Sequence, residues 1–323
     1  MYLEHFGLRE EPFGATPQPK FLYFSPDHTE ALAALHYGLL ERRGLLALVT
    51  GPGMGKTTLL RHLAELWRDR AEIAFVFPPP ETREQLLAAV QDALGLEPAA
   101  DRLAGCRLLR QRAMECRRKG KRLLLLFDEA QDLPPAVLEE VRLLSTLETS
   151  EEKLLEIILA GQPGLLERLG AAAADPLRQR LALVARIGPL DATEVRRYVE
   201  HRLRLAGCKS GRLFTNRALT ALAQISEGVP RIINALCFEA LSSAWAAARR
   251  RIDDHEIRSA AAALDPARAG LIRKPRFGGR LRWAAALALL AVGAAAGRFY
   301  WLHRHAVRTE AAPPAAWSGG MQP

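Results

Sequence analysis

The sequence predicts an α/β fold, a parallel sheet between layers of helices, followed by an all-helical part. Short apolar runs alternate with amphipathic stretches up to Pro189, and the strand signal then ends. Runs that are apolar throughout are typical of strands covered on both faces, as in a parallel sheet. The five predicted strands are Leu45 to Thr50, Glu72 to Phe77, Arg122 to Phe127, Leu155 to Ala160 and Leu181 to Ile187.

Between and after these strands the helical pattern dominates. Amphipathic stretches at Thr58 to Arg70 and Thr82 to Leu94 predict helices that cover the sheet. Beyond Pro189 four further helices are predicted, and they indicate a separate helical subdomain. They are Ala192 to Ala206, Thr215 to Ser226, Pro230 to Arg250 and Asp253 to Leu264.

Length and composition fit a folded chain of about two domains. The chain has 323 residues, of which 49% are hydrophobic and 25% charged, ordinary values for globular proteins. Its four cysteines show no metal-ligand spacing, and the N-terminus does not resemble a cleavable signal sequence. We therefore expect a main body that is cytosolic and reduced.

The net charge of +9 is a local feature. Nine basic residues lie between 268 and 308, where no acidic residue occurs, and the rest of the chain balances 36 basic residues against 36 acidic ones. Nucleic-acid binding needs basic charge on the folded body, and no nucleic-acid module accompanies the neutral one. We therefore expect no nucleic-acid partner.

Within the basic segment, an apolar run predicts a membrane helix. Trp283 to Gly297 carries no charge, and continuation through Leu302 gives 20 residues, enough to span about 30 Å of hydrocarbon. Basic residues are more numerous before the run than after it, so we expect the N-terminal body on the cytoplasmic side of the inner membrane. The alternative is an alanine-rich helix that lies in the membrane interface or packs on a partner.

A glycine-rich turn between the first strand and the next helix predicts a phosphate-binding loop. Its glycines let backbone amides face phosphate oxygens, Lys56 can reach the β- and γ-phosphates, and Thr57 can bind Mg²⁺. One position departs from the usual pattern, because Thr50 stands where the first glycine belongs. Either Thr50 replaces that glycine or the loop is one residue short. The candidate nucleotide-binding residues are Gly51, Pro52, Gly53, Met54, Gly55, Lys56, Thr57 and Thr58.

The third strand ends in two carboxylates that complement this loop. Asp128 is predicted to hold the Mg²⁺ shell together with Thr57, and Glu129 to align and polarise the attacking water. For the Asp-Glu pair alone, a helix-capping turn before Ala130 is the alternative. Together with the lysine loop, the pair predicts a nucleoside triphosphatase that uses ATP and Mg²⁺.

The combination of motifs resembles the AAA+ ATPases of the ExeA/GspA family, membrane-anchored ATPases of bacterial secretion and pilus systems. The resemblance covers roughly residues 1–265. It rests on the loop, on LLLLFDEAQDL, LEIILAGQPGL, PLRQRL and EGVPRIINALCFEAL, and on the opening segment. It implies a AAA+ core with a helical lid. Members with a secretin-assembly role carry a further domain after the membrane helix, so the short C-terminal tail favours the relatives associated with pili or exopolysaccharide export.

The resemblance also implies roles for four residues outside the two motifs. Gln162 resembles a sensor of the γ-phosphate or of the water, although a turn residue before Pro163 is the simpler interpretation. Arg178 and Arg180 lie where such ATPases present an arginine finger to a neighbouring subunit. Structural salt bridges are the alternative for these two. Arg231 resembles the second sensor arginine of the lid, and a capping arginine on the surface is its alternative.

We therefore expect a membrane-anchored, homo-oligomeric ATPase that supports a bacterial secretion, pilus or exopolysaccharide-export machine and binds components of that machine. The alternatives are a DNA-associated AAA+ regulator similar to transposition ATPases, and a nucleotide switch without hydrolysis. The expected organisation is an N-terminal segment packed on the core (1–40), an α/β nucleotide-binding core (41–189), a helical lid (190–265), a basic juxtamembrane linker (266–282), a transmembrane helix (283–302) and a short periplasmic tail (303–323).

Overall fold

A computed structural model describes residues 2–14, 19–149, 153–170, 175–208 and 213–264. By its internal contacts the chain divides into Met1–Ala269 and Gly270–Pro323, and the described residues all belong to the first unit. The strands are β1 (Leu45–Thr50), β2 (Ala71–Val76), β3 (Arg122–Phe127), β4 (Leu155–Gly161) and β5 (Leu181–Ile187). The helices are α1 (Tyr2–Phe6), α2 (Pro26–Leu40), α3 (Lys56–Trp67), α4 (Arg83–Ala93), α5 (Arg102–Arg118), α6 (Pro135–Leu144), α7 (Gly164–Leu169), α8 (Asp175–Gln179), α9 (Ala192–Leu205), α10 (Asn216–Ser226), α11 (Pro230–Ala246) and α12 (Asp254–Leu264), with 3-10 turns η1 (Pro19–Phe21) and η2 (Ala130–Asp132).

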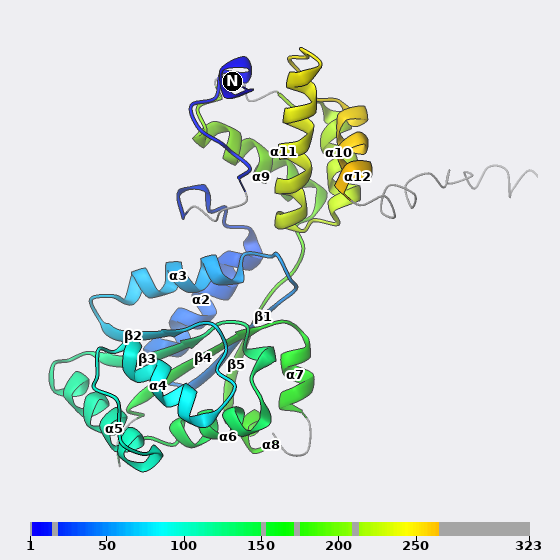
Figure 1. Ribbon diagram of the computed structural model, residues 1–323. Coiled ribbons are helices and arrows are strands. Elements are labelled where there is room, and N and C mark those ends of the chain that lie inside the picture. The colour runs from blue at the N-terminus through cyan, green and yellow to red at the C-terminus, as the bar shows by residue number, and fades with distance from the viewer. Residues whose placement is uncertain (1, 15–18, 150–152, 171–174, 209–212, 265–323) are drawn as a thin grey trace, which may run out of the picture. The chain divides into compact units, whose positions relative to one another are not determined.

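The five strands form one parallel sheet in the order β2-β3-β4-β1-β5, and helices cover both of its faces (Figure 1). Leu125 of β3 pairs with Ile157 of β4, and both belong to the core under α4, α5 and α6. Their neighbours Leu126 and Ile158 belong to the second core, under α2 and α3. Since successive side chains of a strand point to opposite faces, apolar runs without alternation fill both cores. The predicted parallel sheet is confirmed.

Parallel pairing brings the carboxyl ends of all strands to one edge of the sheet. The residues that follow β1, β3 and β4 therefore meet there, although they are far apart in sequence. In open α/β sheets this edge is where ligands bind. The fold thus gathers the glycine turn, the acidic pair and Gln162 on the same side.

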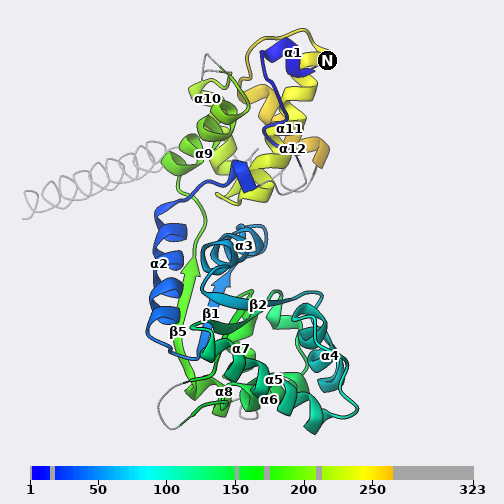
Figure 2. The same cartoon turned by 90° about the vertical axis from the view of Figure 1, so that its left-hand side faces the viewer.

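The predicted helices after the sheet are also present. Asp191 caps α9, because its side chain accepts a hydrogen bond from the backbone of Glu194 and the Glu194 side chain accepts one from the backbone of Asp191. Helices α10, α11 and α12 pack on one another (Figure 2) through buried residues such as Leu222, Ile233 and Ile257. The capping box explains why the chain changes from strand to helix directly after Pro189.

Some element ends differ from the prediction. Helix α3 begins at Lys56 rather than Thr58, directly after the loop. Helix α11 ends at Ala246 rather than Arg250, because Ala248 adopts a left-handed φ of 54° that breaks the helix. The following Arg249 forms an ion pair with Glu256 of α12. In the basic run Arg249 to Arg251 that follows α11, Arg249 is therefore paired with the neighbouring helix.

The predicted membrane helix (283–302), the linker before it and the tail after it lie outside the described residues. In the part of the chain that the structure describes, no helix is long and apolar enough to cross a membrane.

Candidate functional site

The glycine turn joins β1 to α3 and uses its glycines for backbone conformations that other residues avoid. Gly53 and Gly55 have left-handed φ angles of 78° and 91°. Thr50 is the last residue of β1, pairs with Ile187 of β5 and is buried. The turn proper is therefore Gly51 to Gly55, with Met54 buried and Pro52 exposed at its tip.

The N-terminus of α3 has no side-chain cap. Its N-cap is Gly55, whereas Ser25, Thr82 and Asp101 cap α2, α4 and α5 through their side chains. The first amides of an uncapped helix carry partial positive charge and lack partners inside the helix. This helix end therefore fits an anion such as a phosphate.

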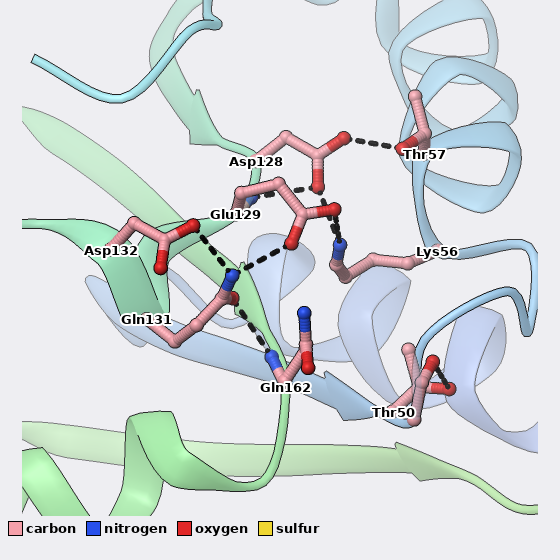
Figure 3. A network of polar contacts seen from close by, with 9 residues as sticks. Thr50, Lys56, Thr57, Asp128, Glu129, Gln131, Asp132 and Gln162 are labelled. Atoms are coloured by element: carbon pink, nitrogen blue, oxygen red, sulfur yellow. Dashed lines mark hydrogen bonds and ion pairs between the residues drawn. The ribbon is translucent and has the colours of Figure 1, made fainter.

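Lys56, Thr57 and the acidic pair form one network at this edge (Figure 3). The Lys56 ammonium lies 2.7 Å from Glu129 Oε1 and 3.0 Å from Asp128 Oδ1. Thr57 Oγ1 donates a hydrogen bond to Asp128 Oδ2. Only 2% of the Asp128 side chain is exposed, against 33% for Glu129. Asp128 is thus the enclosed member of the pair, and Glu129 is the one that solvent can reach.

The backbone around Glu129 is strained, and its carboxylate is held ionised. Its φ of 52° lies in the left-handed region, which is uncommon for a residue with a side chain. Partial burial raises the pKa of Glu129, but hydrogen bonds from Lys56 and Gln131 outweigh this and bring the pKa below its ordinary value, with a smaller contribution from Gln162. At neutral pH this group is therefore a carboxylate able to accept a proton.

Gln131 is a site residue that sequence reasoning missed. Its Nε2 donates to Glu129 Oε2 at 2.8 Å, and its Oε1 accepts the backbone N–H of Gln162 at 3.0 Å. The amide thus joins the ends of β3 and β4 (Figure 3). The sequence signal that could have indicated Gln131 is its place two residues after Glu129 in DEAQDL. The 3-10 turn η2 brings Gln131 back toward the acidic pair.

Gln162 follows β4 directly and lies beside the network. Figure 3 shows its side chain extending toward Lys56 and Glu129, while its backbone is fixed by Gln131. The structure thus brings Gln162 together with the loop and the acidic pair.

Arg231 reaches the loop through its backbone. Its N–H donates to Gly53 O at 3.2 Å, and a Cβ added to Gly53 would lie 2.8 Å from Arg231 Cβ. Arg231 as a residue is exposed. The first turn of α11 therefore contacts the glycine loop at a position where only glycine fits.

Arg178 and Arg180 are not brought to this site. Both are exposed, and they precede β5, whose first residue pairs with Leu45 at the start of β1. The glycine loop follows the other end of β1. The six residues of β1 separate the two edges of the sheet by roughly 17 to 20 Å. Within one chain the two arginines thus belong to the amino edge of the sheet.

Comparisons with known proteins agree with this architecture. Residues 39–169 match a family model described as an AAA domain. General secretion pathway protein A of Aeromonas hydrophila is 42% identical over 265 residues, which cover 81% of this chain and 48% of that protein. The chain therefore spans about half the length of this curated relative.

Two solved structures share the fold at low identity. Cdc6p of Pyrobaculum aerophilum matches with a TM-score of 0.60 and 17% identity, over 78% of this chain and 70% of that one. The ORC2 protein of Aeropyrum pernix, in a structure of its ADPNP and ADP complexes, matches with a TM-score of 0.58 and 16% identity, over 78% and 71% of the two chains.

The glycine loop before α3 and the acidic pair after β3, on a sheet of this strand order, define an AAA domain of the P-loop class. The chain belongs to the GspA/ExeA-like AAA domain proteins and is homologous to general secretion pathway protein A. The family resemblance predicted from the motifs is confirmed.

Proposed function

We propose that this protein binds ATP with Mg²⁺ and hydrolyses it. The observation that carries the proposal is the position of the Lys56 ammonium between Asp128 and Glu129. Lys56 directly follows the glycine loop, at the start of a helix without a side-chain cap. The lysine and the free helix amides suit a triphosphate, and the two carboxylates suit a metal and a water. An AAA domain implies nucleotide binding, and hydrolysis is our extension of it.

Thr57 and Asp128 would hold the metal. The Thr57 hydroxyl and the Asp128 carboxylate already lie within hydrogen-bond distance of each other, and hard oxygen donors of this kind are what Mg²⁺ prefers. When bound, Mg²⁺ would neutralise charge on the phosphate oxygens. Lys56, now paired with both acids, would turn to the phosphates and leave Glu129 as the base.

Glu129 would orient the attacking water and accept its proton. The hydrogen bond from Gln131 would still lower the pKa of Glu129 after Lys56 has turned away, and the partial exposure of Glu129 gives solvent access. Gln131 would hold the carboxylate in place, and Gln162 would contact the γ-phosphate or the water, since an amide both donates and accepts. Arg231 would report the state of the phosphates to the helical lid through the loop contact at Gly53.

The arginine finger would come from a second copy of the chain. Arg178 and Arg180 are exposed at the sheet edge remote from Glu129, so neither reaches the site of its own chain. A homo-oligomer would place one of them at a neighbouring nucleotide.

For the cellular role, we propose an ATPase anchored in the inner membrane through residues 283–302, with the AAA domain in the cytoplasm. It would support a bacterial secretion, pilus or exopolysaccharide-export machine. Support comes from the homology to general secretion pathway protein A and from the apolar, positively flanked segment. Its partners would be inner-membrane or envelope components of that machine.

Two substitutions in the full chain test the proposed reaction. Lys56→Ala should abolish ATP binding measured by calorimetry, because the phosphates lose their cation. Glu129→Gln should keep binding but lower the rate of phosphate release by roughly 10²- to 10⁴-fold, because it removes the base. Lys153→Ala and Glu148→Gln, which break an ion pair elsewhere, serve as matched controls. Normal turnover by Glu129→Gln would refute the assigned base.

A further inference from the structure

Two successive carbonyl groups of the glycine loop are anchored from outside the loop. Gly53 O accepts the backbone N–H of Arg231 at 3.2 Å. Met54 O lies 3.0 Å from Nε2 of His28, a residue of α2. One anchor thus comes from the helical lid, and the other comes from the N-terminal segment.

Anchoring a carbonyl also aims the next amide. A trans peptide is planar, so the N–H of the following residue points away from the carbonyl oxygen. The bond from His28 to Met54 O therefore fixes the direction of the Gly55 N–H, and the bond from Arg231 does the same for the Met54 N–H. Within the described residues neither amide has a hydrogen-bond partner. Both amides remain available to an anion in the loop.

The hydrogen bonds of His28 define its tautomer. Met54 O can only accept, so Nε2 must carry the hydrogen. Nδ1, 2.7 Å from Ser25 Oγ, is then the acceptor of the serine hydroxyl. His28 as a whole residue is 4% exposed, and a Cβ added to Gly55 would lie 3.5 Å from its Nε2. The imidazole is therefore a fixed donor directly behind the loop.

The surroundings of His28 favour this neutral ring. Burial lowers its pKa below the ordinary value, while the bond to Met54 and the charges of Asp27 and Glu194 act in the opposite direction with smaller effect. An apolar side chain would fill the same space without needing two polar partners, so packing alone does not explain a histidine here.

We propose that His28 is a positioning residue of the phosphate-binding loop, which aims the Gly55 amide at the triphosphate through Met54 O. This inference rests on the proposed function. Nothing in the loop motif itself identifies the residue, because His28 lies near the start of α2, and the rest of that helix and β1 separate it from Lys56.

Two amide substitutions separate this role from packing. The Gln Nε2 lies the same number of bonds from Cα as the His Nε2, so His28→Gln keeps a donor for Met54 O. The shorter Asn amide matches the His Nδ1 position, so His28→Asn keeps the contact with Ser25 and loses Met54 O. His36→Gln and His36→Asn are matched controls on the same helix, because His36 bonds Trp67 and not the loop.

The measurements are the Kd and KM for ATP with Mg²⁺, the kcat and the urea midpoint, all in the full chain. Loss of one hydrogen bond should raise Kd and KM of His28→Asn about three- to tenfold. The kcat should stay unchanged, because the loop binds ground state and transition state alike. His28→Gln and both His36 variants should match the wild type in Kd and KM.

Three results would overturn the inference. His28→Asn with normal Kd and KM would show that the contact with Met54 O has no effect on binding. Equal losses in His28→Gln and His28→Asn would assign the effect to packing, and a reduced kcat at unchanged KM would assign it to the transition state instead of nucleotide binding. A wild-type chain that binds no ATP would instead refute the proposed function, so the two failures are distinguishable.

Discussion

Each edge of the sheet contains a buried ion-pair network, and the two networks differ in how the fold holds them. At the carboxyl edge, Lys56 at the start of α3 pairs with Asp128 and Glu129, which directly follow β3. At the amino edge, Arg122 of β3 pairs with Glu156 of β4, both inside strands. The first network rests on a strained backbone, and the second rests on regular strand pairing.

The pKa values of the carboxylates at the two edges are also shifted in opposite directions. Interactions with Lys56 and Gln131 lower the pKa of Glu129, although its burial acts against them. Burial raises the pKa of Glu156 to about 6, although Arg122 opposes it. Arg122 is further tied to the fold, because it donates to Leu40 O and stacks on the Trp67 ring. We infer that the network of Lys56, Asp128 and Glu129 is placed for the proposed chemistry, whereas the Arg122–Glu156 pair stabilises the fold.

The largest effect should come from Arg178 and Arg180 at the amino edge, where the proposed arginine finger would act on the nucleotide of another copy. Replacement of Arg178 or of Arg180 by Ala should lower kcat by roughly 10³- to 10⁵-fold for whichever residue is the finger. ATP affinity should change little. The measurement is phosphate release at saturating ATP, with binding followed by calorimetry.

A mixing experiment tests action between copies. The arginine variant keeps an intact Glu129, and Glu129→Gln keeps intact arginines, so mixed oligomers contain some complete interfaces. Activity of the mixture should exceed the sum of the separate variants. If mixing restores nothing while both variants assemble, the arginines do not act on a neighbour, and the distinction between the edges loses its functional meaning.

A smaller effect is expected for Gln131, which holds Glu129, the proposed base, at the carboxyl edge. Gln131→Leu should lower kcat by roughly 10- to 100-fold, because a hydrogen bond to a charged group contributes about 1.5 to 3 kcal/mol. The pKa of Glu129 should rise without its donor, so the acid limb of the pH–rate profile should move to higher pH.

The matched control is Gln91→Leu. Gln91 is buried whereas Gln131 is partly buried, but the Oε1 of Gln91 likewise accepts a backbone N–H, that of Ala99, away from the acidic pair. It should retain the wild-type pH profile. An equal loss of kcat in both variants, with no shift of the acid limb for Gln131→Leu, would show a general structural effect instead of orientation of Glu129.

The contrast between the edges also explains what the sequence could predict. The glycine loop and the acidic pair are local patterns, and the apolar runs that place them at strand ends are local as well. Gln131 acts by joining β3 to β4, and His28 acts by contacting a loop 26 positions further along the chain. Such roles depend on which elements pack together, which residue spacing does not specify.

Element ends were predictable where the chain itself supplies the signal. Asp191 begins α9 as a capping box readable from its spacing to Glu194. The end of α11 depends on a left-handed Ala248, a residue with no preference for that conformation. The structure gives the positions of four further residues, but their action on a nucleotide is proposed. Their roles therefore stay predictions: Gln162, Arg178, Arg180 and Arg231.

The smallest effect should come from Glu156 at the amino edge. Its folded pKa of about 6 exceeds the ordinary 4.5, so its contribution to stability is full below pH 4.5 and is lost as the pH rises through 6. Glu156→Gln cannot ionise and should escape this loss, which amounts to about 2 kcal/mol for a shift of this size. Relative to the wild type, its urea midpoint should therefore rise between pH 4.5 and 7.5, while ATP turnover stays unchanged. A constant difference across that range would show that Glu156 titrates normally, and reduced turnover would contradict the division of the sheet into a chemical and a structural edge.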